Sequence, residues 1–272
     1  MSPAPLVCPA CRHVVGGDLH VRTLAPVGGL LGCDCGATYP VVDGIPIVFR
    51  DVDTWLRSEG VEALRRHDLP DDVAARIAVG TGGAAARNAS LVDVYTRSRE
   101  GALQDWLRDR IAALDGAILE MGAGIGASSR PDVLALDHNL ALLRHHPAAR
   151  VCGDAADPPF LPASFDAVVL ANVLDSCAQP GLILAQADAL LRPGGRLIVT
   201  CAYAFHEDIT PRGQRFGPQE LAAALDGRAP LLGYGIPHRR IEEIDRVAWP
   251  LALSERLTHV HAAHALISVK SG

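Results

Sequence analysis

Residues 117–126 read AILEMGAGIG, an apolar run of strand length that is followed directly by three glycines at alternate positions. Gly122, Gly124 and Gly126 let the backbone turn tightly and approach a ligand that a β-carbon would repel. The same glycines also fit a plain tight turn with no ligand. The sequence around the turn therefore has to decide between the two interpretations.

The chain around this turn alternates short apolar runs with helix-like stretches. Strand-like runs occupy residues 117–121, 133–137, 149–152, 165–171 and 196–200, and the runs 248–253 and 264–269 would close a sheet. Helical stretches are expected near 53–66, 70–79, 87–114, 138–146 and 180–192. This alternation predicts right-handed crossovers and a mostly parallel sheet, whose ligands bind outside the carboxyl ends of the strands. We therefore expect a doubly wound α/β fold.

Acidic residues follow the second and third of these strands. Asp137 ends the second strand, where a carboxylate can accept hydrogen bonds from both hydroxyls of a ribose. Asp154, in the run Gly153-Asp154-Ala155, follows the third, where it can accept a hydrogen bond from an adenine amino group. The alternative is that both residues only cap turns. Three such signals at three successive strand ends favour a nucleoside-containing ligand.

Over roughly residues 90–272, the sequence resembles the class I S-adenosylmethionine-dependent methyltransferases. The matching pieces are residues 120–126, Asp137, 153–155, 165–169 and 191–197. The resemblance implies a Rossmann-like sheet of seven strands and S-adenosylmethionine as cofactor. It implies a cofactor site made of Glu120, Gly122, Gly124, Asp137, His138, Asp154, Ala155 and Asn172. No Gly-x-x-x-x-Gly-Lys-Ser/Thr run is present to hold a nucleoside triphosphate.

One departure from the family pattern concerns the connection between the first two strands. Gly126 and Asp137 are only eleven positions apart, and Pro131 lies between them. The helix usually found there should be little more than a turn.

The loops after the fourth and fifth strands, residues 171–180 and 201–211, lie where a methyl acceptor must approach. They resemble the methyltransferase module of ovothiol synthases and, more loosely, carnosine N-methyltransferases, which act on imidazole nitrogens. The resemblance implies a small-molecule or peptide acceptor methylated on nitrogen, with Asp175 and Tyr203 as the catalytic residues. Asp175 would hold a ring N–H and stabilise the growing positive charge. Two alternatives stay open. Asp175 could cap a helix and Tyr203 be ordinary packing; separately, His206 could be a general base for a hydroxyl acceptor.

Four cysteines near the N-terminus, Cys8, Cys11, Cys33 and Cys35, form two knuckles suited to a structural Zn²⁺ held by four thiolates. With residues 39–46, they resemble the small zinc-ribbon proteins that bind and activate tRNA and translation-factor methyltransferases. That family expects two residues between the second pair of cysteines, where this chain has one, so His13 is an alternative ligand. The histidines at 259, 261 and 264 are interpreted as a solvated tail rather than as a metal site.

Composition limits the classes of function. The net charge of −6 disfavours nucleic acid as a partner. No run of 18 apolar residues is present, which predicts a cytoplasmic protein without a membrane segment. The predicted parts are a zinc-ribbon-like module (1–50), a helical linker or lid (51–100) and a methyltransferase domain (101–272). An RNA methyltransferase and a non-catalytic binding partner with this fold are the alternatives, and the oligomeric state is left open.

Overall fold

The computed structural model describes residues 4–59, 70, 72–73, 85–128 and 130–272. The N-terminal elements are β1 (His13–Val15), β2 (Asp18–His20), β3 (Ala25–Val27), β4 (Leu30–Gly32), β5 (Thr38–Val42), β6 (Ile45–Val48) and α1 (Val52–Glu59). The next are α4 (Ala85–Arg97), α5 (Ala102–Ala112), β7 (Ile118–Met121), β8 (Val133–Asp137), α6 (Leu140–Leu143), β9 (Ala149–Gly153) and β10 (Phe165–Ala171). The last are α7 (Pro180–Leu190), β11 (Leu191–Cys201), a 3₁₀ turn (Arg212–Gln214), α8 (Pro218–Ala224), β12 (His238–Ser254) and β13 (Leu257–Lys270).

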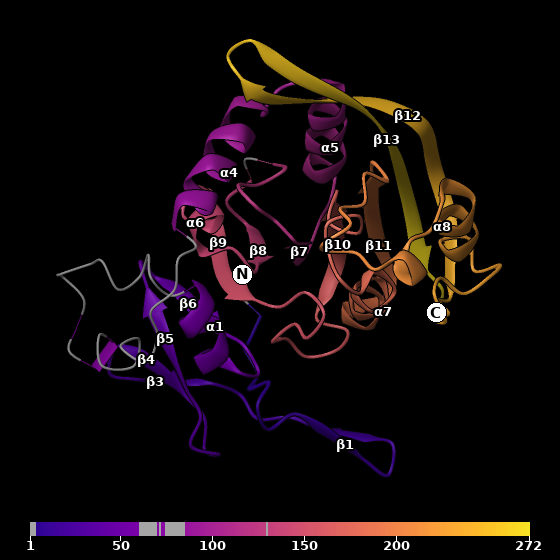
Figure 1. The fold of residues 1–272 in the computed structure, drawn as a ribbon. Coiled ribbons are helices and arrows are strands. Elements are labelled where there is room, and N and C mark those ends of the chain that lie inside the picture. The colour runs from indigo at the N-terminus through magenta and orange to yellow at the C-terminus, as the bar shows by residue number, and fades with distance from the viewer. Residues whose placement is uncertain (1–3, 60–69, 71, 74–84, 129) are drawn as a thin grey trace.

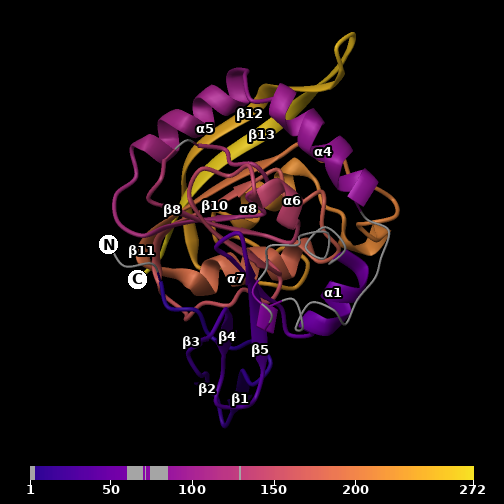
Figure 2. The same ribbon diagram turned by 90° about the vertical axis from the view of Figure 1, so that its left-hand side faces the viewer.

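One large sheet organises the molecule. Within the described ranges it has eleven strands in the order β12-β13-β11-β10-β7-β8-β9-β6-β5-β4-β3, while β1 and β2 form a separate hairpin. The strands β6 to β11 pair parallel with their neighbours in the centre, and both edges of the sheet are antiparallel. Figures 1 and 2 show the N-terminal strands and the tip of the β12–β13 hairpin at opposite ends of the molecule.

The α/β class is confirmed, but the predicted sheet of seven mostly parallel strands is too small. All seven predicted strands, now β7 to β13, are present, and four N-terminal strands extend the sheet. The extension begins where β6 pairs with the edge strand β9, Ile47 lying opposite Cys152 and Val48 opposite Gly153. Edge pairing uses backbone N–H and C=O groups, which every sequence has, so the side-chain pattern did not reveal it.

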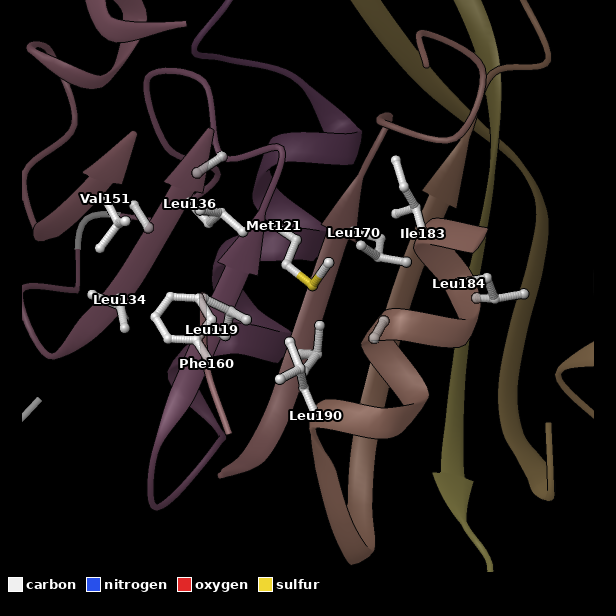
Figure 3. Close-up of a cluster of buried hydrophobic side chains, with 14 of the residues drawn as sticks. Leu119, Met121, Leu134, Leu136, Val151, Phe160, Leu170, Ile183, Leu184 and Leu190 are labelled. Carbon is white, nitrogen blue, oxygen red and sulfur yellow. The ribbon is translucent and has the colours of Figure 1, made fainter. Parts of the chain in front are cut away.

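The core lies on both faces of the central strands because successive strand residues point to opposite sides. Leu119 and Met121 of β7 belong to one buried cluster and Ile118 to another. Figure 3 shows the first cluster, in which side chains of β7, β8 and β10 pack with Phe160 and with residues of α7. The second cluster is covered by α5 through Leu103, Trp106, Leu107 and Ile111. This two-sided burial fixes the strand ends that form the site.

The helices partly differ from the sequence expectations and partly agree with them. The stretch predicted as one helix over 87–114 is divided into α4 and α5, because Gly101 between them has a φ of +129°. No helix is found between β7 and β8 in the described residues, as the short spacing predicted. Residues 60–66 of one predicted helix and most of another over 70–79 lie outside the described residues.

None of the helices in the described part of the chain is both long and apolar enough to cross a membrane. The predicted cytoplasmic location and the domain boundaries near residues 50 and 100 stay predictions.

Candidate active site

A cavity of about 620 Å³ lies at the carboxyl ends of β7, β8, β9 and β10. All eight residues of the predicted cofactor site line it: Glu120, Gly122, Gly124, Asp137, His138, Asp154, Ala155 and Asn172. They come from four different strand ends, which the sheet order brings side by side. This position is where parallel α/β sheets generally bind their ligands.

The glycine turn forms one wall of the cavity and requires its glycines. Gly122, Gly124 and Gly126 have φ values of +68°, +54° and +98°, a region that other residues rarely adopt. A β-carbon on Gly122 would lie 2.4 Å from Cγ2 of Val173, another cavity residue. The N–H of Gly122 also donates to the carbonyl of Leu136, at 2.8 Å. The turn is thereby held against β8 and against the loop after β10.

Asp137 links the glycine turn to the end of β8. Its Oδ2 accepts the N–H of Gly124 at 2.8 Å, and its Oδ1 accepts the N–H of Asn139 at 2.7 Å. Burial raises the pKa of Asp137, while these two N–H groups oppose the shift. A carboxylate can accept about four hydrogen bonds, so Asp137 keeps capacity for a ligand in the cavity.

Glu120 braces the same turn from beneath. Its Oε1 accepts the N–H of Ala127 at 2.7 Å, and its Oε2 lies 3.4 Å from Nε2 of His146. Nδ1 of His146 accepts the N–H of Ala148 at 3.1 Å. A neutral His146 therefore carries its proton on Nε2, and this N–H donates a hydrogen bond to Glu120. His146 is almost fully buried, and no sequence motif singles it out.

His138 is held by the N-terminal part of the chain. Nε1 of Trp55 in α1 donates to its carbonyl at 3.2 Å, and its ring meets Phe49 edge-on with 5.4 Å between the ring centroids. These contacts support the predicted place of His138 at the border of the cavity.

The remaining predicted cofactor residues follow β9 and β10. Asp154 is exposed, and its Oδ1 accepts the N–H of Ala156 at 2.8 Å. Asn172 has a φ of +53°, and its Oδ1 accepts a hydrogen bond from Oγ1 of Thr200 at 3.0 Å. The Asn172 N–H in turn donates to the Thr200 carbonyl, which ties the end of β10 to β11.

A second part of the cavity wall was not expected from the sequence. It comes from α4, α5 and β12, and we call it the helical wall: Tyr95, Ser98, Arg99, Gln104, Leu107, Arg108 and Trp249. Arg99 bridges to the glycine turn, because its NH2 group donates to the carbonyls of Ile125 and His145. No motif marks these residues: six of them lie within residues 95–108, and folding brings them together with Trp249 and against the strand ends.

The two predicted catalytic residues, Asp175 and Tyr203, are not among the cavity-lining residues. The Asp175 side chain is buried, and its Oδ2 accepts the N–H groups of Ala202 and Ala204, both at 3.1 Å. Burial raises the pKa of Asp175, and these N–H groups oppose the shift. This arrangement favours a role in holding the loop after β11 over the predicted contact with an acceptor.

Tyr203 belongs to a hydrogen-bonded chain instead. Its hydroxyl lies 2.7 Å from Nδ1 of His264, whose Nε2 lies 2.9 Å from Oε1 of Glu243. His264 is buried, so the expectation of a solvated tail is wrong for this residue. His206, the alternative base, is exposed and does not line the cavity.

The four N-terminal cysteines converge. All their sulfur atoms lie within 4.8 Å of one another, and the pairs Cys8–Cys35 and Cys11–Cys33 are 3.7 Å apart. Within the described ranges, this is the only group of histidines, cysteines or carboxylates with such geometry. The hydroxyl of Tyr39 lies 3.2 Å from Sγ of Cys8.

The single residue between Cys33 and Cys35 does not prevent this convergence. The Cys33 N–H donates to the Ala37 carbonyl and the Gly36 N–H to the Cys33 carbonyl, so the chain closes a tight turn between β4 and β5. Gly36 has a φ of +91°, which permits the turn. The alternative ligand His13 lies outside the group.

The N-terminal module, residues 4–50, clamps the turn that carries Asp154. Arg12 forms an ion pair with Asp157 and donates to the carbonyl of Pro158 at 2.7 Å. Arg50 adds a second ion pair to Asp157, its Nε lying 2.9 Å from Oδ2. The N–H of Asp157 donates to the carbonyl of Asp154 at 3.1 Å. Arg12 directly follows Cys11 in the chain. The cysteine group is thus connected to the turn that carries Asp154 through Arg12 and Asp157.

Comparison with known proteins identifies the central part of the chain. Residues 119–199 match the methyltransferase domain family. The demethylmenaquinone methyltransferase of Renibacterium salmoninarum is 35% identical over 114 residues, which cover 36% of this chain and 48% of that protein. The enzyme of the same name from Paenarthrobacter aurescens is 29% identical over 140 residues, covering 46% of this chain and 54% of that protein. The chain thus spans about half the length of these curated relatives.

Among solved structures, a SAM-dependent methyltransferase from Thermotoga maritima, described as a possible histamine N-methyltransferase, aligns with a TM-score of 0.46 and 17% identity. The alignment covers 68% of this chain and 99% of that chain. The stretch that matches the methyltransferase domain family, residues 119–199, contains the glycine turn and the ends of β7 to β10.

Proposed function

We propose that this chain transfers a methyl group from S-adenosylmethionine to a small-molecule or peptide acceptor, with a nitrogen of an imidazole or amine as the methylated atom. One observation carries the proposal: the glycine turn, Asp137 and Asp154 converge on a single cavity at the carboxyl ends of four strands. The family match over residues 119–199 supports the same reaction class.

The donor groups of the cavity fit this cofactor. Asp137 would hold the ribose hydroxyls, and Asp154, whose Oδ2 has no partner in the described part of the chain, would accept from the adenine amino group. The glycine turn leaves room for the backbone to approach the ligand. When bound, S-adenosylmethionine supplies an electrophilic methyl group on its sulfonium. The chain's own residues hold the reactants in line and exclude water.

Binding of the cofactor product tests the proposal directly. Calorimetry of the full chain with S-adenosylhomocysteine should give one site in the micromolar range, while ATP and NAD should not bind measurably. If neither S-adenosylmethionine nor S-adenosylhomocysteine binds, the proposed function and the cofactor site both fail. That result would favour the non-catalytic binding partner.

A nitrogen acceptor is supported by the scarcity of bases in the cavity. Of the lining carboxylates in the described ranges, Glu120 already bonds to Ala127 and His146. Asp137 and Asp154 are the two that the proposal assigns to the cofactor, which leaves no lining carboxylate to act as a base on the acceptor. An imidazole is largely neutral at pH 7 and presents a free lone pair, so it needs alignment more than proton removal. Mass spectrometry with methyl-labelled cofactor and matched imidazole, amine and phenol acceptors should find label on the first two. Retention on RNA at physiological salt would instead favour an RNA methyltransferase.

We expect the variant Asp175→Asn to bind S-adenosylhomocysteine as the wild type does and to keep turnover within about threefold once an acceptor is found. The amide oxygen of asparagine can still accept the N–H groups of Ala202 and Ala204. Because burial already raises the pKa of Asp175, loss of its charge should cost little stability. A loss of turnover of about 10²-fold at unchanged melting temperature would restore the acceptor contact predicted from the sequence.

We also propose that the four cysteines bind one structural Zn²⁺. Tetrahedral zinc with Zn–S bonds of about 2.3 Å needs sulfur atoms about 3.8 Å apart, and the two close pairs are at 3.7 Å. Four protein ligands leave no open position for chemistry, so the metal would stabilise the fold. Elemental analysis after purification without chelator should find about one equivalent of zinc, and less than about a tenth would reject the site.

The clamp on Asp157 predicts that the N-terminal module supports the cofactor site. Asp157→Asn should lower the affinity for S-adenosylhomocysteine about five- to tenfold, because weaker bonds from Arg12 and Arg50 loosen the turn that carries Asp154. The matched control is Asp132→Asn, which weakens the ion pair with Arg130 at the opposite end of β8 and should leave the affinity unchanged. Equal affinities of wild type and Asp157→Asn would show that the clamp does not reach the cavity.

A further inference from the structure

Tyr95, on α4, has an open hydroxyl in the helical wall. It lines the cavity and is half-buried, and its hydroxyl makes no hydrogen bond within the described ranges of the chain. The hydroxyl of Tyr203, by contrast, already lies 2.7 Å from Nδ1 of His264. An open hydroxyl that borders a cavity is available to a bound ligand.

The position of Tyr95 is fixed from both sides of the cavity. One turn further along, Oγ of Ser98 donates to the carbonyl of Val94 at 2.7 Å and accepts the N–H of Ala252 in β12 at 2.9 Å. Arg99 then connects the same segment to the glycine turn through the carbonyl of Ile125 at 3.1 Å. These bonds hold the end of α4 between β12 and the predicted cofactor site, so Tyr95 is placed rigidly in the wall.

The hydroxyl is a proton donor at neutral pH. Burial raises the pKa of Tyr95, and the carboxylates of Asp137 and Asp175 raise it further. Asp137 lies on the predicted cofactor side of the cavity, and Asp175 lies in the loop after β10. The negative charges of both carboxylates therefore act on the Tyr95 hydroxyl. A protonated phenol can donate one hydrogen bond to a ligand atom that carries a lone pair.

The rest of the helical wall is suited to a flat ring. Trp249 and Leu107 are almost fully buried and present apolar surface to the cavity. Gln104 lies in the same wall, and its Oε1 is buried without a hydrogen-bond partner among the described residues. An apolar surface beside a small number of polar atoms binds a planar molecule and fixes its orientation.

We propose that the helical wall is the acceptor subsite and that it takes a planar aromatic or heteroaromatic acceptor. The Tyr95 hydroxyl orients this acceptor by donating a hydrogen bond to one of its lone-pair atoms. The proposal rests on the proposed function, because it assigns the acceptor to the part of the cavity that S-adenosylmethionine would not fill. It makes Tyr95 a specificity-determining residue outside the region that matches the methyltransferase family.

Two isosteric probes test the hydrogen bond without a known acceptor. Quinoline and naphthalene have the same shape, but only quinoline carries a ring nitrogen with a lone pair. Nuclear magnetic resonance titration of the full chain saturated with S-adenosylhomocysteine should show quinoline binding about fivefold more tightly, the usual effect of one hydrogen bond. In Tyr95→Phe, the two probes should bind equally, and the affinity for S-adenosylhomocysteine should stay within twofold of wild type.

The substitution should not disturb the fold, because the hydroxyl it removes has no protein partner in the described ranges. The matched control is Tyr234→Phe, which removes the hydroxyl of a surface tyrosine and should keep the preference for quinoline. The proposal is overturned if neither probe binds the wild type, or if the preference persists in Tyr95→Phe. It is also overturned if Tyr95→Phe lowers S-adenosylhomocysteine affinity more than tenfold, since Tyr95 would then hold the cofactor. A wild type that binds no S-adenosylhomocysteine defeats the proposed function, and the probes titrated against the free chain then decide the Tyr95 proposal separately.

Discussion

Replacing Gly122 with alanine is expected to lower the affinity for S-adenosylhomocysteine by about a hundredfold or more. A residue with a β-carbon at a φ of +68° is strained, by about 1–2 kcal/mol. The β-carbon would also lie 2.4 Å from Cγ2 of Val173, so the glycine turn or the loop after β10 must shift. Overpacking of this kind typically costs about 1–3 kcal/mol. The free protein relieves this strain by shifting the turn, and a ligand that needs the original turn must restore it, so a penalty near 3 kcal/mol opposes binding and corresponds to about a hundredfold in affinity. Calorimetry measures the change.

The matched control separates backbone strain from the clash. Gly194 has a comparable φ of +78°, but a β-carbon there would meet no atom within 4 Å. It lies outside the cavity wall, so Gly194→Ala should lower the melting temperature slightly and leave the affinity unchanged. Unchanged affinity in Gly122→Ala would mean that the glycine turn does not touch the ligand.

If the four cysteines hold the proposed Zn²⁺, its removal is expected to unfold the N-terminal module and to weaken cofactor binding at least tenfold. Structural zinc contributes an apparent free energy of about 10–16 kcal/mol to small sites, which is comparable with the whole stability of a typical domain. Cys8 and Tyr39 belong to the same buried cluster as Leu119 and Leu136 of the central strands. Loss of the module would therefore expose part of the main core and release the clamp on Asp157.

Chelation by 1,10-phenanthroline and the variant Cys8→Ser should give the same result. Circular dichroism reports the loss of structure, and calorimetry reports the affinity for S-adenosylhomocysteine. Adding zinc back should restore the chelated wild type but not Cys8→Ser. The control Cys201→Ala changes a buried cysteine of β11 outside the metal group and should keep its zinc. If the protein keeps full affinity for S-adenosylhomocysteine while its N-terminal module is zinc-free and unfolded, the proposal that the module supports the cavity is contradicted.

The local parts of the site could be predicted from the sequence. A glycine reports where the backbone needs a positive φ, and Asp137 ends its strand, so residues that line the cavity could be named before their geometry was known. The strands β7 to β13 were also predictable, because central strands that are buried on both faces appear in the sequence as short continuous apolar runs.

The contacts of Asp175 could not be predicted in this way. Its place after β10 is equally compatible with facing the acceptor and with holding a loop. Only the approach of the Ala202 and Ala204 N–H groups from the end of β11 favours the loop. The direction of a side chain in a turn depends on what other segments bring to it.

The sequence by itself determined the class of fold, the glycine turn, the acidic residues at the strand ends and the pattern of the four N-terminal cysteines. Tertiary structure alone decided that β6 extends the sheet at β9, that Arg12 and Arg50 clamp Asp157, and that α4, α5 and β12 form the helical wall. The features in the first group depend on residues that are close together in the chain, so neighbouring residues alone determine their backbone geometry and side-chain order. The second group depends on residues as far apart as Arg12 and Asp157, which meet only after the buried core has fixed the positions of the elements that carry them.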